Sequence, residues 1–210
     1  MSVASNCPSC GAPVQFRWSS AVQAKCEYCQ AILVRHDVDL QKVGEVADLP
    51  VDASPLQIMT EGQYRGKNFM VVGRIVYQWE QGRWNEWHIV FSDGSSGWLS
   101  DAQAEYAVSF WVQLPHAMPP ADQLPRGQAF NWNNANYTVT VLTPARYVGF
   151  DGELPFTTQD RTEMLFADLR TEDGRFATLD YSEDPPLLFM GETVDFASLQ
   201  LRNLRQFEGW

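Results

Sequence analysis

Two Cys-x-x-Cys hooks constrain what this chain can fold into more than any other feature. Cys7 and Cys10 form the first hook, CPSC, and Cys26 and Cys29 form the second, CEYC, after fifteen intervening residues. Each hook turns two thiolates toward one point, and the intervening segment is long enough for a small hairpin, so the spacing predicts a zinc ribbon. Four thiolates complete a tetrahedral shell. We therefore expect a structural zinc ion, which supplies folding free energy and activates no water.

The residues around the hooks favour short strands and tight knuckles. Segments 14–16 and 22–24 alternate apolar and polar residues, as two short strands would, and 31–34 predicts a third strand. Gly11 follows the first hook and is suited to the positive φ of a metal-binding knuckle, whereas Gln30 stands at the matching place of the second. Gln30 loosens that knuckle slightly without removing a ligand.

Charge and composition exclude two broad classes of protein. The 210 residues are 45% hydrophobic, which is enough to bury a core, so global disorder is excluded. The 26 acidic side chains outnumber the 15 basic ones, and the net charge of −11 lies outside the neutral first 40 residues. We expect no nucleic-acid partner, because nonspecific binding depends on neutralising phosphates. The excess acid either keeps the chain soluble or attracts a basic, polyamine-like partner.

The amino terminus and the cysteines predict the compartment. MSVASNCPSC lacks a basic segment followed by an apolar run, and no stretch approaches the roughly 20 apolar residues that span a bilayer. We therefore expect a cytoplasmic protein without membrane insertion. In a reducing compartment, cysteine hooks bind metal more often than they form disulfides. His36 lies seven residues after Cys29, too late to be needed as a ligand, and is expected in solvent.

The rest of the chain is expected to be antiparallel β. Residues 1–36 would be the ribbon, 37–55 a loosely packed linker, 56–120 a first β repeat and 121–210 a second. The repeat is an ordered series of matching segments: 68–71, a Trp-rich strand, Asp93-Gly94 and Trp98-Leu99 in the first copy, and 136–139, 164–170, Asp173-Gly174 and 176–181 in the second. Duplication predicts two related halves, packed as a sandwich or closed as one barrel.

Two segments of the second repeat depart from simple strands. Residues 143–159 form an insert relative to the first copy, and its glycines and Pro155 predict a mobile loop. Residues 194–204 fit either a strand with a bulge or a short helix, because their apolar spacing matches neither period cleanly.

Two stretches of the β region are distinctive: FADLRTEDGRFATLDYSEDPPLLFMGE at 166–192 and VVGRIVYQWEQGRWNEWHIVFSDGSSGWL at 71–99. Both resemble segments of a bacterial family, domain of unknown function 4178. The resemblance extends over roughly residues 56–205, and members with a leading zinc ribbon look like this whole chain. It implies no agreed activity and no residue roles. Similar proteins are often encoded beside polyamine-synthase-like enzymes and small membrane proteins, which implies a membrane-associated or stress-related assembly and association with a membrane protein.

Polar candidates outside the cysteines each have a structural alternative. Glu86 and His88 would point the same way on a strand, so the carboxylate would orient the imidazole of a general base, or both would face solvent beside buried Trp87. A set of acids would bind a cation or occupy solvated turns: Asp168, Asp173, Asp180, Glu183 and Asp184. Four tryptophans would line a groove or fill the core: Trp79, Trp84, Trp87 and Trp98.

The function expected from these features is that of a non-enzymatic adaptor. A structural zinc ribbon would be attached to a β-domain that binds a protein partner through exposed edges or aromatic patches. The alternative is a domain or enzyme that binds a small cationic or polyamine-like ligand in an acidic pocket of the β-domain.

Overall fold

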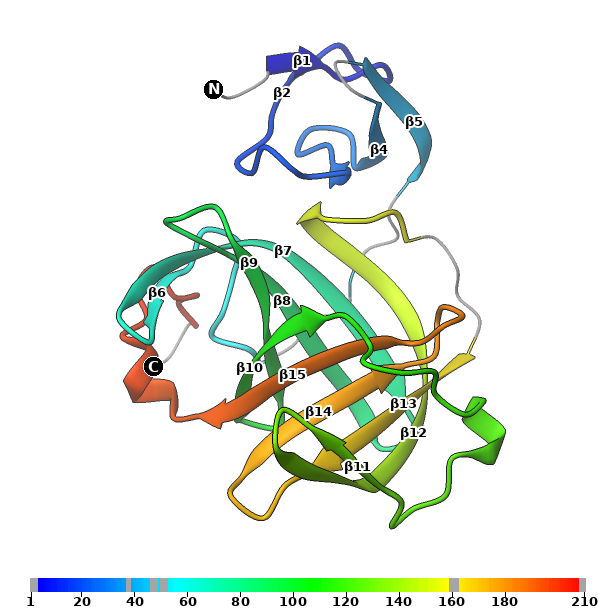
Figure 1. The fold of residues 1–210 in the computed structure, drawn as a ribbon. Helices are drawn as coiled ribbons and strands as arrows, with labels where there is room; N and C mark the ends of the chain where they lie inside the picture. Colours follow the sequence, from blue (N-terminus) through cyan, green and yellow to red (C-terminus); the bar gives the residue numbers. More distant parts are fainter. Residues whose placement is uncertain (1–3, 37–38, 46–48, 50–52, 159–162, 208–210) are drawn as a thin grey trace.

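The chain folds mainly into antiparallel β-strands, and the computed structural model describes residues 4–36, 39–45, 49, 53–158 and 163–207 (Figure 1). The strands are β1 (Ala4–Asn6), β2 (Pro13–Gln15), β3 (Gln23–Lys25), β4 (Ala31–His36), β5 (Asp39–Glu45), β6 (Glu61–Tyr64), β7 (Lys67–Trp79), β8 (Gly82–Phe91), β9 (Ser96–Ala102), β10 (Glu105–Val112), β11 (Ala129–Trp132), β12 (Ala135–Leu154), β13 (Glu163–Arg170), β14 (Arg175–Asp180) and β15 (Leu187–Val194). In the described residues, two 3-10 turns accompany them, η1 (Ala121–Gln123) and η2 (Phe196–Leu199). The predicted mainly-β fold is confirmed.

Eight of the described strands close into a barrel, with the ribbon at one end of it (Figure 1). Antiparallel pairs run from β7 through β8, β9, β10, β15, β14 and β13 to β12, and β12 then pairs with β7. β12 is 20 residues long, so it pairs with β13 along one stretch and with β7 along the next; Arg146 faces Glu163 on one side and Gln78 on the other. Of the two packings that the sequence left open, the structure has the barrel.

The two halves of the barrel repeat the same backbone hydrogen bonds. Val71 donates to the carbonyl of Thr60 at 2.8 Å, and Val139 donates to that of Gln128 at 2.9 Å. The strand pairing shifts register directly after Val71 in one half and directly after Val139 in the other. Both copies of the Asp-Gly turn close with a glycine N–H bonded to the carbonyl three residues earlier. The segment order that the repeat predicted is therefore the order of the structure.

The outer face of each half of the barrel is covered by a separate set of side chains, whereas the inner faces of the two halves form one common cluster. The outer cluster of the first half includes Val71, Trp87, Ile89, Leu99 and Val108, covered by Leu56, Leu199 and their neighbours. The outer cluster of the second half includes Val139, Ala167, Leu169, Leu179 and Leu188, covered by Leu124 and Trp132. The inner cluster draws Ile75, Tyr77, Trp98, Tyr147 and Phe150 from both halves. The alternation of buried side chains along each strand thus supports a layer on both sides of the sheet.

The predicted mobile loop is wrong over most of its length, because β12 continues as a strand to Leu154. The glycines of this segment permit close packing: a Cβ on Gly152, whose φ is +70°, would lie 2.2 Å from the carbonyl oxygen of Val72. The end of the predicted insert, residue 159, lies outside the described residues. Residues 194–204 were predicted as either a strand with a bulge or a short helix, and the structure has the short 3-10 helix η2 in this segment. The stretch predicted as a linker contains β5, which pairs with β4.

Candidate metal centre

The four cysteines come together as the spacing predicted. Their Sγ atoms all lie within 4.8 Å of one another, and the Cys7–Cys29 and Cys10–Cys26 pairs are both 3.8 Å apart. A tetrahedral ion with metal–sulfur bonds of about 2.3 Å sets its ligands about 3.8 Å apart, so the cluster fits a four-coordinate metal ion. All four ligand positions of such an ion would be filled by sulfur, which leaves no site for a reacting water. His36 is exposed on β4 and outside the cluster.

Each hook is shaped by the same two backbone hydrogen bonds. Cys7 donates to the carbonyl of Ala12 and receives a bond from Gly11, while Cys26 donates to Ala31 and receives one from Gln30. Gly11 and Gln30 both have positive φ, +76° and +60°. The second knuckle therefore has the same turn as the first and carries its strain on a residue with a side chain. The Ala31 amide and the neighbouring thiols lower the pKa of Cys29 to about 7, whereas desolvation and the neighbouring thiols raise the pKa of Cys10 to about 12. Without a metal, the cluster therefore favours a thiolate at Cys29 and a thiol at Cys10.

The ribbon is joined to the barrel through Glu153, near the end of β12. Glu153 is 2% exposed, and its carboxylate accepts the backbone N–H groups of Arg17 at 2.7 Å and Trp18 at 2.9 Å. An Arg17 guanidinium nitrogen lies 3.5 Å from the same carboxylate. Burial raises the pKa of Glu153, and these donors oppose the rise. β12 also pairs with β3, so ribbon and barrel share one sheet.

His88, on β8 of the barrel, contacts the backbone of Glu153. Its Nδ1 is 3.2 Å from the backbone carbonyl oxygen of Glu153, and its ring packs between Trp18 of the ribbon, 4.8 Å away, and Trp98 of β9, 5.1 Å away. His88 is fully buried, and this desolvation lowers its pKa to about 4. It is therefore a neutral imidazole at the ribbon end of the barrel.

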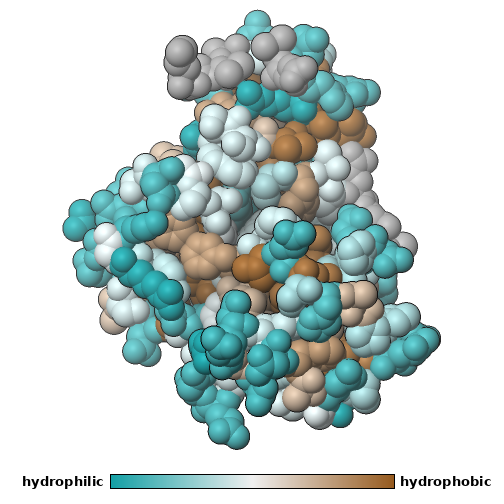
Figure 2. Space-filling model, in the orientation of Figure 1, coloured by the Kyte–Doolittle hydropathy of each residue, from teal (hydrophilic) through white to brown (hydrophobic). Residues whose placement is uncertain are grey.

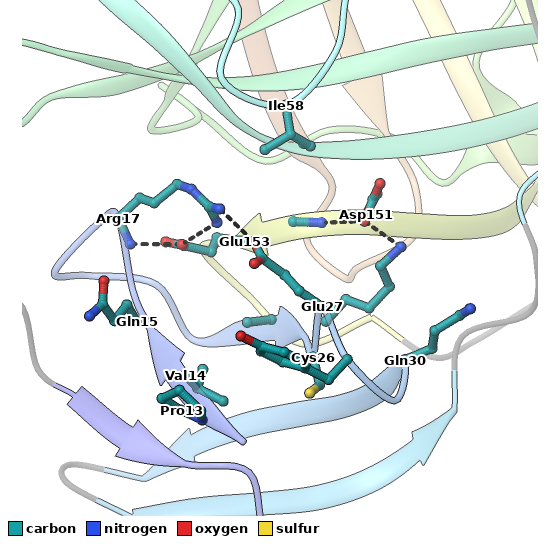
Figure 3. Close-up of a pocket in the computed structure, with 14 residues that line it drawn as sticks. Pro13, Val14, Gln15, Arg17, Cys26, Glu27, Gln30, Ile58, Asp151 and Glu153 are labelled. Carbon is teal, nitrogen blue, oxygen red and sulfur yellow. Dashed lines mark hydrogen bonds and ion pairs between the residues drawn. The ribbon is translucent and has the colours of Figure 1, made fainter. Parts of the chain in front are cut away.

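A cleft of about 590 Å³ opens between the second knuckle and β12 (Figure 3). Its charged side chains pair across it: Lys25 with Asp151 at 2.5 Å, and Arg17 with both Glu27 and Glu153. Tyr28 lies at the rim and is 69% exposed. The cleft contains both signs of charge, each already neutralised, beside an exposed aromatic ring.

The structure does not assemble the predicted general base. Glu86 accepts hydrogen bonds from Trp84 Nε1 at 3.0 Å and Ser100 Oγ at 2.7 Å, while His88 contacts Glu153 instead. The solvent-facing alternative is also wrong, because His88 is fully buried and burial raises the pKa of Glu86 to about 7. Both side chains point into the barrel, whose inner face the sequence pattern of a single strand did not reveal.

The other candidates divide between core and surface. Asp168 and Asp180 lie on the inner face of the barrel, where burial raises the pKa of both, while Asp173, Glu183 and Asp184 are exposed. Trp87 and Trp98 are buried in the core, and Trp79 and Trp84 are half-buried. Trp111, which the sequence did not single out, is 60% exposed. Figure 2 shows polar side chains over much of one face, with hydrophobic side chains gathered near its middle.

Sequence reasoning missed Glu153, Arg17 and Trp18. Glu153 lies in the insert of the second repeat, which has no counterpart in the first, and the other two lie in the turn between the hooks.

The fold and the cysteine cluster define a β-barrel protein with a candidate four-cysteine metal centre at one end. Residues 57–196 match the family described as a domain of unknown function, DUF4178, so the chain belongs to that family. The chain has no significant match among curated proteins or solved structures. None of the helices in the described part of the chain is long and apolar enough to cross a membrane.

Proposed function

We propose that this chain is a non-enzymatic adaptor in which a structural zinc ion shapes a ribbon that binds a protein partner. The closed four-thiolate cluster carries the proposal, because an ion held by four sulfurs stabilises a fold and has no position for substrate. Zinc is the ion that such tetrahedral thiolate sites most often hold. The folding free energy that the zinc ion supplies would hold the surface of the small ribbon in a fixed shape.

The partner surface that we propose consists of the second knuckle and the adjoining cleft. Tyr28 offers a large ring with a polar end, a residue type enriched where proteins bind one another. The cleft beside it has room for a side chain or a short segment of a partner. Because its charges are already paired, selection would depend on shape and on the aromatic contact. A membrane protein or a component of a stress-related assembly would be a suitable partner of this kind.

Affinity capture from native cells, followed by binding with the purified partner, tests the adaptor proposal. The Tyr28→Ala variant should retain its zinc and lose partner affinity by roughly tenfold or more, as expected for an anchoring aromatic residue. The Cys7→Ser, Cys10→Ser variant should lose both metal and partner. Val141→Ala, at another exposed apolar side chain, is the matched control and should bind normally.

Equal binding of the partner by the intact chain and by both ribbon variants would contradict the adaptor proposal. It would place the partner surface on the barrel.

A second candidate function is supported by the inner face of the barrel. Glu86, Asp168 and Asp180 lie there with raised pKa values, beside stacked Tyr77 and Trp84 rings 5.2 Å apart. Carboxylates beside aromatic faces are the groups that recognise an organic cation. In this alternative the barrel would bind a small, polyamine-like ligand.

Thermal unfolding with and without spermidine separates the two candidates. Cation binding inside the barrel would raise the melting temperature of the wild type and not that of Glu86→Gln, since a ligand stabilises only the state that binds it. An equal shift in both proteins would mean surface screening and would remove the second candidate.

A further inference from the structure

Glu153 connects the ribbon and the interior of the barrel through different parts of one residue. Its carboxylate holds the backbone of Arg17 and Trp18 in the ribbon, and its backbone carbonyl contacts His88 in the barrel. Its peptide lies close against β7: a Cβ on Gly73 would be 2.0 Å from the Glu153 carbonyl oxygen. Only glycine leaves room for this approach, so the position of Glu153 is set by the barrel backbone.

The carboxylate depends on the ribbon for its hydrogen bonds. A buried, charged carboxylate is costly unless it is well supplied with donors, and the two backbone N–H groups belong to the turn between the cysteine hooks. The ribbon has a small core of its own, which includes Val14, Phe16 and Leu33. A metal bound to the hooks would therefore be needed to hold that turn in place.

Trp18 covers the ribbon end of the barrel. Its ring meets His88 edge to face at 4.8 Å, and His88 in turn lies 5.1 Å from Trp98 on the inner face. Ile32, on β4 of the ribbon, packs against the same inner cluster. The ribbon thus supplies two apolar side chains to the barrel interior and shields an imidazole whose Nε2 has no hydrogen-bond partner among the described residues.

We propose that the cysteine cluster controls the closure of the barrel: when its metal is bound, Glu153 and Trp18 close the ribbon end over His88, and when the metal leaves, that end opens. The coupling runs through the chain from the hooks to the Arg17–Trp18 turn, from the turn to Glu153, and from Glu153 and Trp18 to His88. The rest of the barrel stays closed by its own strand pairs and two outer cores. This device is independent of which partner the ribbon binds.

Histidine NMR of the full chain tests the coupling, with the metal bound and after chelation. The chain has three histidines. The ring of His88 should titrate near pH 4 in the metal-bound protein and shift toward the ordinary value of about 6.5 after chelation. His116, which packs against Phe130 and Trp132 in the second half, is the internal control, and its ring resonances at a fixed pH should be the same before and after chelation.

Amide exchange of two variants tests the role of Glu153 with the metal bound. Glu153→Gln should keep its metal, while amide exchange at the ends of β8 and β12 becomes faster by on the order of tenfold. The reason is that the glutamine side chain has an NH2 group in place of one carboxylate oxygen, and this donor would face a backbone N–H group of the ribbon. Glu27→Gln is the matched control: Glu27 also pairs with Arg17, but its side chain is 67% exposed, so closure should be unchanged.

Two results would overturn the coupling. One is chelation that releases the ribbon amides and leaves His88 and β8 unchanged. The other is wild-type exchange in metal-bound Glu153→Gln. If Glu153→Gln does not fold, Trp18→Ala replaces it, since it removes the cover and leaves the carboxylate and its donors. That variant should retain metal and expose His88, and a His88 that still titrates near pH 4 would refute the proposal.

Discussion

The ribbon and the barrel are built from the same short antiparallel strands, yet different forces hold them. The barrel closes on itself and buries two outer clusters and one inner cluster, with side chains such as Leu99 and Leu179 fully buried. The ribbon has one small cluster, in which Cys7 and Cys26 are themselves buried members. A chain that cannot bury enough apolar area needs a metal, whereas a closed barrel does not. The two regions should therefore respond differently to the same perturbation.

Metal removal should produce the largest difference between them. Chelation should unfold residues of the ribbon, because structural zinc supplies roughly 10–16 kcal/mol of apparent binding free energy. The barrel should keep its far-ultraviolet β signal and the slow amide exchange of β13 and β14. Circular dichroism and exchange measured together check this result. Loss of protection throughout both regions would show that the barrel has no independent stability.

Only some features of the ribbon and the barrel were predictable from the sequence. The cysteine spacing predicted the metal cluster, and alternation with Asp-Gly turns predicted the strands and the repeat, because both signals are local. The closure of β12 onto β7 was not predictable, since it depends on Gly73 and Gly152 allowing two backbones to approach. Of these two, Gly152 lies in the segment that was predicted as a mobile loop, because a permissive backbone serves close packing and flexibility alike.

The site was predictable to a similar extent. The four ligands follow from the hooks, but the junction at Glu153 requires contact between residues more than 130 positions apart, such as Arg17 and Glu153. The alternation of residues along one strand predicted that Glu86 and His88 share a face of the sheet. It could not predict that this face lies inside a barrel, because closure depends on the other strands.

A substitution in the barrel core should have the opposite pattern to metal removal: it should destabilise the barrel and leave the metal of the ribbon in place. Leu99→Ala removes a fully buried side chain from the outer cluster of the first half and should lower the free energy of unfolding of the barrel by about 2–5 kcal/mol. Urea denaturation measures the change, and metal content should remain at the wild-type level. Val141→Ala, at a side chain that is 40% exposed, should change stability by less than about 0.5 kcal/mol. Metal loss in Leu99→Ala would mean that the barrel supports the ribbon as strongly as the ribbon closes the barrel.

Gly73→Ala tests the contact where the two regions meet. The new Cβ would lie 2.0 Å from a backbone oxygen, so β7 and β12 must separate, and we expect a loss of about 1–3 kcal/mol. Gly44→Ala is the control, because its Cβ would meet only the end of the flexible Ile32 side chain, at 3.4 Å. Unfolding monitored by tryptophan fluorescence compares them. Equal stability of the two variants would show that the close approach is not needed.

The smallest expected effect is a pH dependence confined to the barrel. Burial raises the pKa of Glu86 from 4.5 to about 7, so the folded state binds more protons than the unfolded state between these values, and stability falls as pH rises. Glu86→Gln removes this fall. Relative to the wild type, the variant should gain on the order of 1 kcal/mol between pH 5 and 7, since one pKa unit corresponds to about 1.4 kcal/mol and partial solvent access reduces the effect.

His88 contributes with the opposite sign. Its pKa is lowered from 6.5 to about 4, so its contribution to stability is lost as pH falls from 6.5 toward 4. This contribution is present in the wild type and in Glu86→Gln, so it cancels when the two are compared at each pH. A difference between the two proteins that does not change with pH would contradict a raised pKa for the half-buried carboxylate of Glu86.

X-ray absorption at the zinc edge, on protein purified without added metal, decides whether the four cysteines hold a zinc ion. We expect one zinc ion per chain with four sulfur scatterers at about 2.3 Å, and loss of that signal in the Cys7→Ser, Cys10→Ser variant. Nitrogen or oxygen scatterers in place of sulfur, or a folded ribbon that contains no metal, would contradict this expectation.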